Sequence, residues 1–251
     1  MGLEAINLTK RFFDAKRGEF NAVQSVSFSC HKGEIFGLLG PNGAGKTTTL
    51  RMITTILKPT SGTAKINDFD VTKSPRQVRG QLGFVSADTG LYERLTPREI
   101  LTYFGKLSKY PKEKLTERIA EVTSMLQMES FLDSRCEKLS TGMKQKVSIA
   151  RAIVHDPPVI IMDEPTTGLD VLTSQVLHKF ILQCKEMNKC VVFSSHIMSE
   201  AEKLCDRMAI IHKGQVLASG TLEKLRAESG MHYLEDIFLN VVKEEDIVEA
   251  R

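Results

Sequence analysis

The amino-acid sequence predicts an α/β fold, and three observations support this class. A glycine-rich loop at residues 40–45 lies between an apolar run and a helical pattern. Continuous apolar runs at 159–162 and 190–193 are typical of strands buried on both faces of a sheet. Helical patterns separate these runs, and a length of 251 residues suits one large domain or one domain with an insertion.

The composition is that of an ordinary globular chain, with 41% hydrophobic and 26% charged residues. The net charge is only +3 and the Lys and Arg residues are dispersed, which argues for neither nucleic acid nor an anionic membrane face as a partner. The five cysteines form no C-x-x-C pair, so we expect buried thiols in a reducing compartment. We expect no signal peptide, and the apolar runs fall far short of the ~20 residues of a membrane span. Any membrane-spanning part would belong to another chain.

The glycine-rich loop fits the phosphate-binding pattern G-x-x-x-x-G-K-[ST], with a strand expected over 34–39 and a helix over 46–57. Its glycines let the backbone curl so that N–H groups point at phosphate oxygens, and the helix N-terminus adds roughly half a positive charge. Lys46 is expected to reach the β- and γ-phosphates, and the Thr47 hydroxyl to bind Mg²⁺. The sequence therefore predicts a nucleotide phosphate site made by Gly40, Pro41, Asn42, Gly43, Ala44, Gly45, Lys46, Thr47 and Thr48.

The segments on either side of this loop carry strand patterns. Residues 2–32 predict short strands with turns, and 22–29 alternates apolar and polar residues as a half-buried strand does. A small strand pair is expected at 64–66 and 70–71, and a short buried strand at 82–85.

The character of the sequence changes after Val85. Thr96 predicts a helix N-cap, and Glu99 completes a capping box. The following stretch is also helical, so we expect a helical subdomain over 87–150, inserted into an α/β core formed by 1–86 and 151–220. The core should then contain a helix over 171–187 and a hairpin of 208–211 with 215–218. A short helical tail is expected over 221–251.

Two acidic residues follow the apolar run 159–162. Asp163 is placed to support Mg²⁺ at the end of a core strand, and Glu164 to accept a proton from the water that attacks the γ-phosphate. The alternative is a surface acidic pair before a proline. His196 follows the strand at 190–193, where it can contact the γ-phosphate and hold Glu164 and the water in line, although a lone histidine is more often structural.

Two aromatic residues, Phe12 and Phe13, lie in a polar stretch after Lys10-Arg11. One of them could stack on an adenine ring. An aromatic side chain covering a sheet edge explains the pattern equally well.

Together with Leu139-Ser140-Thr141-Gly142-Met143, these motifs resemble the ATP-binding subunit of ABC transporters over nearly the whole chain. The resemblance implies a P-loop NTPase (RecA-like) core with a small antiparallel β subdomain and an inserted helical subdomain. It matches residues 139–143 to the signature motif, 168–170 to the D-loop, His196 to the switch histidine and Phe12 to the adenine-stacking aromatic.

The resemblance also implies a mechanism. In this family, the helix that begins at Ser140 and Gly142 binds the γ-phosphate of ATP held on a second subunit. We therefore expect a homodimer, or a pair with another ATPase subunit, that closes around two MgATP. The pair would drive a separate transmembrane permease from the cytoplasmic face of the cell membrane.

Two positions depart from the family pattern. Thr141 and Met143 replace residues of the usual Leu-Ser-Gly-Gly-Gln signature, which keeps the main-chain donors but removes a glutamine side chain. The loop after Val85 normally carries a glutamine that touches Mg²⁺, and its place falls on Ala87. That role is vacant or is taken by Ser86 or Asp88.

Residues 88–96 are similar to the NatA-type ATPases of sodium exporters, and 233–238 resembles the short tail of exporter ATPases with separate permeases. Sodium export is therefore expected, with the permease docking near Leu91, Tyr92, Tyr103 and Phe104, although internal packing also explains these residues. The alternative function is a soluble ABC ATPase acting on ribosomes or nucleic acid. Such proteins usually join two ATPase halves or carry long arms, whereas this chain has one copy of each motif. A GTPase would need an Asn-Lys-x-Asp motif, and a kinase would leave residues 139–143 unexplained.

Overall fold

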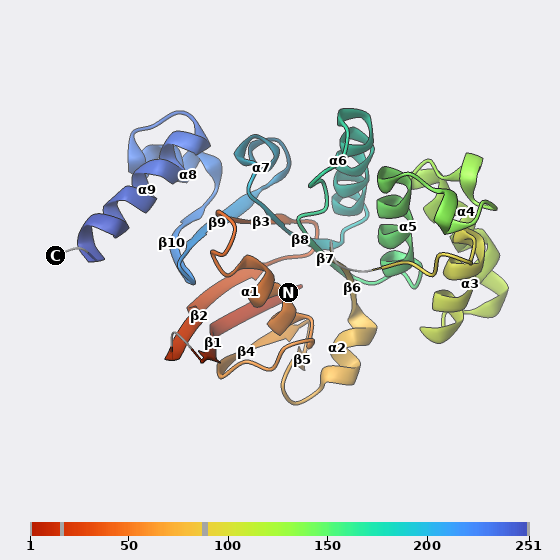
Figure 1. Ribbon diagram of the computed structural model, residues 1–251, viewed down its shortest axis with the longest axis horizontal. Coiled ribbons are helices and arrows are strands. Elements are labelled where there is room, and N and C mark those ends of the chain that lie inside the picture. Colours follow the sequence, from red (N-terminus) through yellow and green to blue (C-terminus); the bar gives the residue numbers. More distant parts are fainter. Residues whose placement is uncertain (1, 16–17, 87–89, 250–251) are drawn as a thin grey trace.

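In the computed structural model, the described residues (2–15, 18–86 and 90–249) form two β-sheets with helices around them (Figure 1). The larger sheet has the strand order β10-β9-β3-β8-β7-β6. All neighbours are parallel except the edge strand β10, which forms the predicted hairpin with β9. These strands are β3 (Ile35–Leu39), β6 (Leu82–Ser86), β7 (Val159–Asp163), β8 (Cys190–Ser195), β9 (Arg207–His212) and β10 (Gln215–Gly220). The predicted α/β class is confirmed.

The smaller sheet is antiparallel, with the order β2-β1-β4-β5. Its strands are β1 (Leu3–Asp14), β2 (Gly18–Cys30), β4 (Ser61–Ile66) and β5 (Phe69–Asp70). The prediction of short strands with turns over 2–32 is wrong, because β1 and β2 run for 12 and 13 residues. Asn7 and Ser25 have the polar character of turn residues, but they take positive φ of 48° and 53° at register shifts inside a continuous ladder.

Helix α1 (Lys46–Ile53) packs between the two sheets, where it contacts β1, β2, β4 and β7. It ends four residues before the predicted Leu57. The Thr54 hydroxyl donates to the carbonyl of Leu50, and Thr55 takes a positive φ of 64°, which ends the helical path.

The chain between the neighbouring strands β6 and β7 is mainly helical and lies at one end of the molecule (Figure 1). The capping box is confirmed, since Thr96 Oγ1 accepts from the Glu99 amide and Glu99 accepts from the Thr96 amide. The helices are α3 (Pro97–Leu107), α4 (Leu115–Met125) and α5 (Thr141–Ile153), with 3-10 turns at Lys112–Lys114, Glu129–Phe131 and Cys136–Lys138. They share one hydrophobic cluster with β6, β7 and β8, so a unit bounded at 87 and 150 stays a prediction.

Two buried cations, Arg118 and Lys189, share the exposed carboxylate of Asp156 and tie α4 to the loop before β7. Arg118 is 4% exposed, and its guanidinium lies 3.1 Å from Asp156. The Lys189 ammonium contacts the same carboxylate at 2.7 Å. Burial raises the pKa of Asp156, but the Lys189 hydrogen bond and the Arg118 charge outweigh it and hold that pKa below its ordinary value.

Of the remaining helices, α6 and α7 pack on the larger sheet, α8 and α9 pack at its β10 edge, and α2 contacts β4, β5 and β6. The helix predicted over 171–187 is present as α6 (Val171–Glu186), and the helical tail is present over the described residues. The others are α2 (Pro75–Gln81), α7 (Met198–Leu204), α8 (Leu222–Ser229) and α9 (Leu234–Glu249). Hydrophobic clusters fill both faces of the larger sheet, which leaves the carboxyl ends of its strands for a site.

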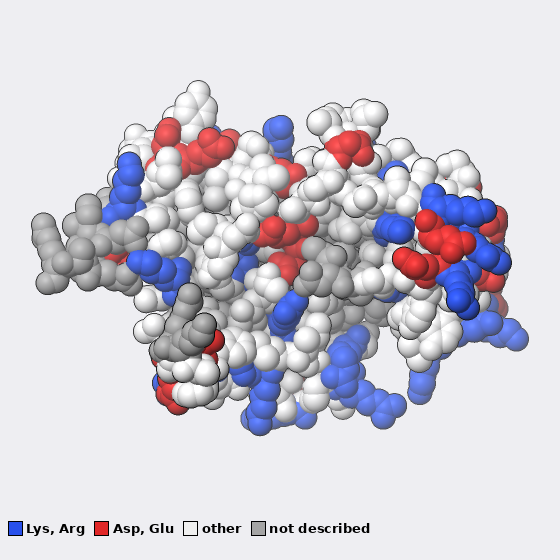
Figure 2. All heavy atoms as spheres, in the orientation of Figure 1, with Lys and Arg blue, Asp and Glu red and all other residues white. Residues whose placement is uncertain are grey.

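No helix in the described part of the chain has the length and apolar character needed to cross a membrane. On the face drawn in Figure 2, several Lys and Arg side chains lie along the lower edge, whereas at the right-hand end they are mixed with Asp and Glu. The five cysteines are free thiols; Cys30, Cys136, Cys184 and Cys190 are buried as expected, whereas Cys205 is partly exposed.

Candidate nucleotide site

The loop between β3 and α1 depends on its glycines for different reasons. Gly43 and Gly45 have φ of +82° and +104°, which other residues rarely adopt. A Cβ on Gly45 would also lie 2.7 Å from the Ala22 carbonyl, and one on Gly40 would lie 2.2 Å from the Ile211 carbonyl. The loop can therefore pass close to β2 and β9 only with glycine at these places.

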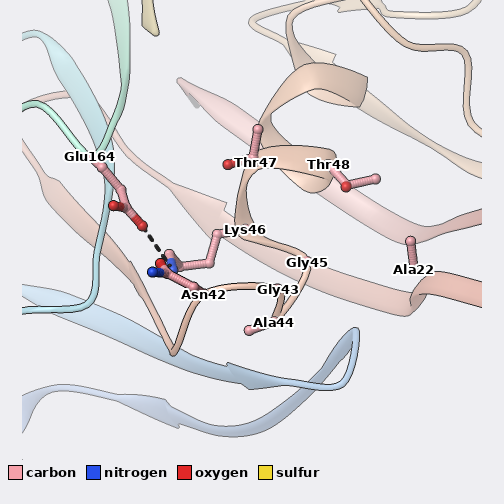
Figure 3. A pocket seen from close by; sticks show the side chains of 9 residues that line it. All are labelled: Ala22, Asn42, Gly43, Ala44, Gly45, Lys46, Thr47, Thr48 and Glu164. Carbon is pink, nitrogen blue, oxygen red and sulfur yellow. Dashed lines mark ion pairs between the residues drawn. The ribbon is translucent and has the colours of Figure 1, made fainter. Parts of the chain in front are cut away.

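A cavity of about 140 Å³ lies above this loop (Figure 3). This volume is well below the roughly 300 Å³ at which pockets for whole small molecules begin, so it suits phosphates rather than a complete nucleotide. The α1 N-terminus opens into it, which favours an anion. The lining residues are Ala22, Asn42, Gly43, Ala44, Gly45, Lys46, Thr47, Thr48 and Glu164.

The Lys46 ammonium lies between the loop and an acidic side chain. Its Nζ donates to the carbonyls of Gly40 at 2.7 Å and Pro41 at 3.1 Å, and it lies 3.1 Å from Glu164 Oε1 (Figure 3). The side chain is only 4% exposed. The charge is thus held at the cavity by two main-chain acceptors and one carboxylate.

Glu164 is held in an unusual backbone conformation directly after β7. Its φ is +49°, and its amide donates to both the carbonyl (3.2 Å) and the hydroxyl (3.0 Å) of Ser194. Burial raises the pKa of Glu164, but the hydrogen bond and charge of Lys46, with the charge of His196, outweigh it and hold that pKa below the ordinary value. Non-glycine residues in this backbone region concentrate at functional sites.

His196 lies next to Glu164, with Nδ1 3.1 Å from Glu164 Oε2. It follows β8, which lies between the loop strand β3 and the acidic strand β7. The strand order therefore brings together Lys46, Glu164 and His196, which are far apart in the sequence.

Asp163 and Thr47 are the residues expected to support Mg²⁺. Asp163 is 5% exposed, and no Lys, Arg or His of the described chain forms an ion pair with it. Within those same residues, no group of three or more His, Cys, Asp or Glu could hold a metal by itself. Thr47 lines the phosphate cavity, whereas Asp163 does not line it and directly precedes Glu164, which does. One hydroxyl and one nearby carboxylate fit Mg²⁺, which keeps waters and takes its other ligands from phosphates.

Ser140 and Gly142 do not line this cavity. Ser140 is the N-cap of α5, and its hydroxyl accepts from the Met143 amide at 3.3 Å. A Cβ on Gly142 would lie 2.9 Å from Thr173 Oγ1, so glycine is needed there for packing against α6. The start of α5 is therefore not part of the phosphate cavity of its own chain.

Phe12 lies in β1 opposite Phe20 of β2, with ring centroids 6.1 Å apart. The Lys10 ammonium lies 5.2 Å from the centre of the Phe12 ring. Phe20 is two residues from Ala22, which lines the cavity, and sequence reasoning missed it. The pairing of β1 with β4 ends at Thr9, so at Phe12 this strand is paired only with β2, and both interpretations of the ring stay predictions.

Sequence reasoning also missed the polar residues that hold the acidic loop. The Ser194 hydroxyl donates to Asp163 Oδ1 at 2.6 Å, and Thr167 Oγ1 donates to Glu164 Oε2 at 3.2 Å. Gln145 Nε2 donates to the carbonyl of Pro165 at 2.9 Å. Glu200 accepts from Thr166, which lies two residues after Glu164. The Ser-Ser pair before His196 was the available signal for the first of these contacts.

Of the three residues at the place where the family carries a glutamine, only Ser86 belongs to the described part of the chain. Ala87 and Asp88 lie outside the described residues. Ser86 is buried at the end of β6, directly opposite Asp163 in the sheet register. Its part in metal binding stays a prediction.

Comparison with known proteins agrees with this geometry. The sequence model of the family described as "ABC transporter" matches residues 23–167. The ABC transporter ATP-binding protein NatA of Bacillus subtilis (strain 168) is 42% identical over 92% of this chain and 94% of its own. The Nod factor export ATP-binding protein I of Paraburkholderia xenovorans (strain LB400) is 38% identical over 84% and 69%.

A solved dimer of the bacterial ABC transporter cassette MJ0796 covers 87% of this chain and 98% of its own, with a TM-score of 0.79 and 27% identity. The same cassette has been solved as a dimer in a post-hydrolysis state with ADP and Pi. These matches confirm the fold that the motifs implied. The chain therefore belongs to the ABC transporter family, as one of its ATP-hydrolysing subunits.

Proposed function

We propose that this chain works in pairs as the motor of a membrane exporter, at the cytoplasmic face of the membrane, with a separate permease and sodium as the cargo. One observation carries the proposal. Lys46 and Glu164 line one cavity and His196 contacts Glu164, while Ser140 and Gly142 at the start of α5 do not line it. One chain thus supplies two halves of different sites.

Binding begins with an exchange of partners at Lys46. In the structure, its ammonium is shared between two loop carbonyls and Glu164. Phosphate oxygens entering the cavity compete for this charge. When Lys46 turns to the phosphates, Glu164 loses the contact that most depresses its pKa and becomes a stronger base.

Glu164 then accepts the proton of the attacking water through Oε1, while His196 Nδ1 holds Oε2. Thr167 donates to the same Oε2, so the carboxylate cannot turn freely. Thr47 and Asp163 would hold Mg²⁺, which supplies positive charge at the phosphates. Phe12, with Phe20 beside it, would stack on the adenine outside the phosphate cavity.

The second half of each site comes from a partner chain. Ser140 and Gly142 begin α5, whose free amides can bind the γ-phosphate held on the other subunit. The dimeric relative MJ0796 supports this arrangement. A second copy of this chain is the simplest partner, and a paired ATPase subunit is the other.

The permease would dock beside α3. Tyr92 and Tyr103 are each 54% exposed, and both pack against Phe104, with ring centroids 6.5 Å and 5.3 Å from its own. The guanidinium of Arg151 lies 5.4 Å from the Phe104 ring centre. Tyr92 of this cluster belongs to the segment 88–96 that resembles sodium-exporter ATPases, and this resemblance is what supports sodium as the cargo.

The test is ion flux in vesicles that hold this chain with a candidate multi-span permease. ATP outside the vesicles should drive sodium movement, and Glu164→Gln in the same vesicles should stop it. Flux of another solute with no sodium movement would refute the cargo alone. Association with ribosomes or nucleic acid instead of membranes would refute the transport function.

A further inference from the structure

The larger sheet places one serine between the two acidic residues of the site. Ser194 is 0% exposed and lies opposite Asp163 in the parallel pairing of β7 with β8. Its hydroxyl donates to Asp163 Oδ1 at 2.6 Å and accepts from the Glu164 amide at 3.0 Å. The same serine's carbonyl accepts from that amide at 3.2 Å.

We propose that Ser194 is a positioning residue for ATP hydrolysis, which fixes the Asp163 carboxylate for Mg²⁺ and the Glu164 backbone for the attack of water. This inference rests on the roles proposed above for Asp163 and Glu164. Ser194 itself touches neither phosphate nor water.

The hydrogen-bond directions leave no freedom in this arrangement. The Glu164 N–H can only donate, so the serine oxygen must accept from it. The single hydroxyl proton is then available for Asp163, and a short O–H···O⁻ bond in a buried place is among the stronger neutral-to-charged contacts. The hydroxyl therefore sets the rotation of the Asp163 carboxyl group.

The hydrogen bonds from the Glu164 amide to Ser194 have a second consequence. Its φ of +49° is unfavourable for a residue with a Cβ, and two acceptors from Ser194 hold its amide in place. A shift of Asp163 on metal binding is transmitted through one hydroxyl to the backbone that carries the base.

The neighbouring Ser195 provides a matched control. It is also a buried serine, 3% exposed, at the end of β8. Its hydroxyl donates to Glu200 at 3.2 Å and accepts from the Ile197 amide at 3.0 Å. Ser195→Ala therefore removes an equivalent hydroxyl without touching either acidic residue of the site.

The experiment measures the affinity of a fluorescent ATP analogue in EDTA and in Mg²⁺, together with phosphate release and thermal unfolding. We call the ratio of the affinity in Mg²⁺ to the affinity in EDTA the Mg²⁺ gain. For Ser194→Ala we expect an unchanged affinity in EDTA and a Mg²⁺ gain that is about 10-fold smaller than in wild type. The kcat should fall by about 10–100-fold, as for other residues that orient metal ligands. Ser194→Thr, which keeps the hydroxyl, should recover most of the Mg²⁺ gain. Ser195→Ala should keep that gain within about twofold of wild type.

Two results would overturn the inference. One is a Ser194→Ala variant with wild-type Mg²⁺ gain and kcat. The other is a variant whose affinity in EDTA and unfolding temperature fall together with kcat, since this shows a merely structural role. Asp163→Asn separates this inference from the proposed function. If this variant keeps the Mg²⁺ gain, the proposed metal role of Asp163 is wrong. If it loses the gain while Ser194→Ala keeps it, only the proposed role of Ser194 is wrong.

Discussion

Replacing Glu164 by glutamine should move ATP binding and ATP hydrolysis in opposite directions. Glutamine keeps the size of the side chain but removes the charge that pairs with Lys46 at 3.1 Å. At an effective dielectric constant of 20, that distance corresponds to about 5 kcal/mol of attraction. The cost of removing both charges from water offsets most of this attraction. We take about 1.4 kcal/mol as the net free energy of the Lys46–Glu164 pair that ATP must replace, which corresponds to a tenfold change in ATP affinity.

The variant should therefore bind ATP about tenfold more tightly than wild type, because Lys46 is free for the phosphates. Its turnover should fall by about 10²–10⁴-fold, the usual share of a general base. Equilibrium binding of a fluorescent ATP analogue and steady-state phosphate release measure the two effects on the same samples.

A matched control is Glu34→Gln, which removes another buried carboxylate. Glu34 is 8% exposed and pairs with Arg207 at 3.0 Å, away from the cavity. It should leave ATP affinity and turnover close to wild type. Turnover of Glu164→Gln near wild type would remove Glu164 as the base, and an unchanged or weaker ATP affinity would show that the pair with Lys46 does not oppose binding.

Three further predictions follow from contacts in other parts of the site and fold. Phe12→Ala should weaken ATP binding by about 1–3 kcal/mol if the ring stacks on adenine. Phe13→Ala, which removes a ring that is 77% exposed, should leave ATP binding unchanged. Equal affinities of the two variants in nucleotide titrations would count against stacking. Ser140→Asp keeps a good helix cap, so the unfolding temperature should hold, but its charge should prevent the MgATP-dependent dimer seen by light scattering; a wild-type dimer would contradict the role of this helix start. Asp156→Asn removes the carboxylate that pairs with both Arg118 and Lys189, while Arg118 keeps its pair with Glu121; because Asp156 is exposed, the loss should be about 1 kcal/mol at pH 7. Because the pKa of Asp156 is depressed in the folded state, its contribution to stability is complete above the ordinary pKa of about 3.9 and is lost as the pH falls through the lower folded value. The difference in unfolding free energy between variant and wild type should therefore shrink in strong acid. A difference that stays constant with pH would contradict this reasoning.

The sequence by itself determined the features that depend on neighbouring residues. The phosphate loop needs glycines at positions with positive φ, and its lysine and threonine follow at fixed spacing, so Gly43, Gly45, Lys46 and Thr47 were identifiable from the pattern. The capping box at Thr96 was predicted for the same reason, because its two hydrogen bonds close within one turn.

Local pattern misled where long-range pairing overrides it. The pattern over 2–32 predicts short strands with turns, but the ladder between β1 and β2 is continuous and contains Asn7 and Ser25 as irregularities, because pairing along two long strands forms more backbone hydrogen bonds than a turn would. The end of α1 was placed too late because the positive φ of Thr55 is not encoded by its residue type.

Only the tertiary structure decided how the acidic residues are held. The sheet order puts β8 between β3 and β7, which sets Ser194 opposite Asp163 and His196 beside Glu164 across about thirty residues of sequence. Strand order and register come from which apolar faces pack together, and no local spacing specifies them. The residues proposed to carry the chemistry could therefore be named from the sequence, whereas the Ser194 hydroxyl that contacts both acidic residues became visible only in the fold.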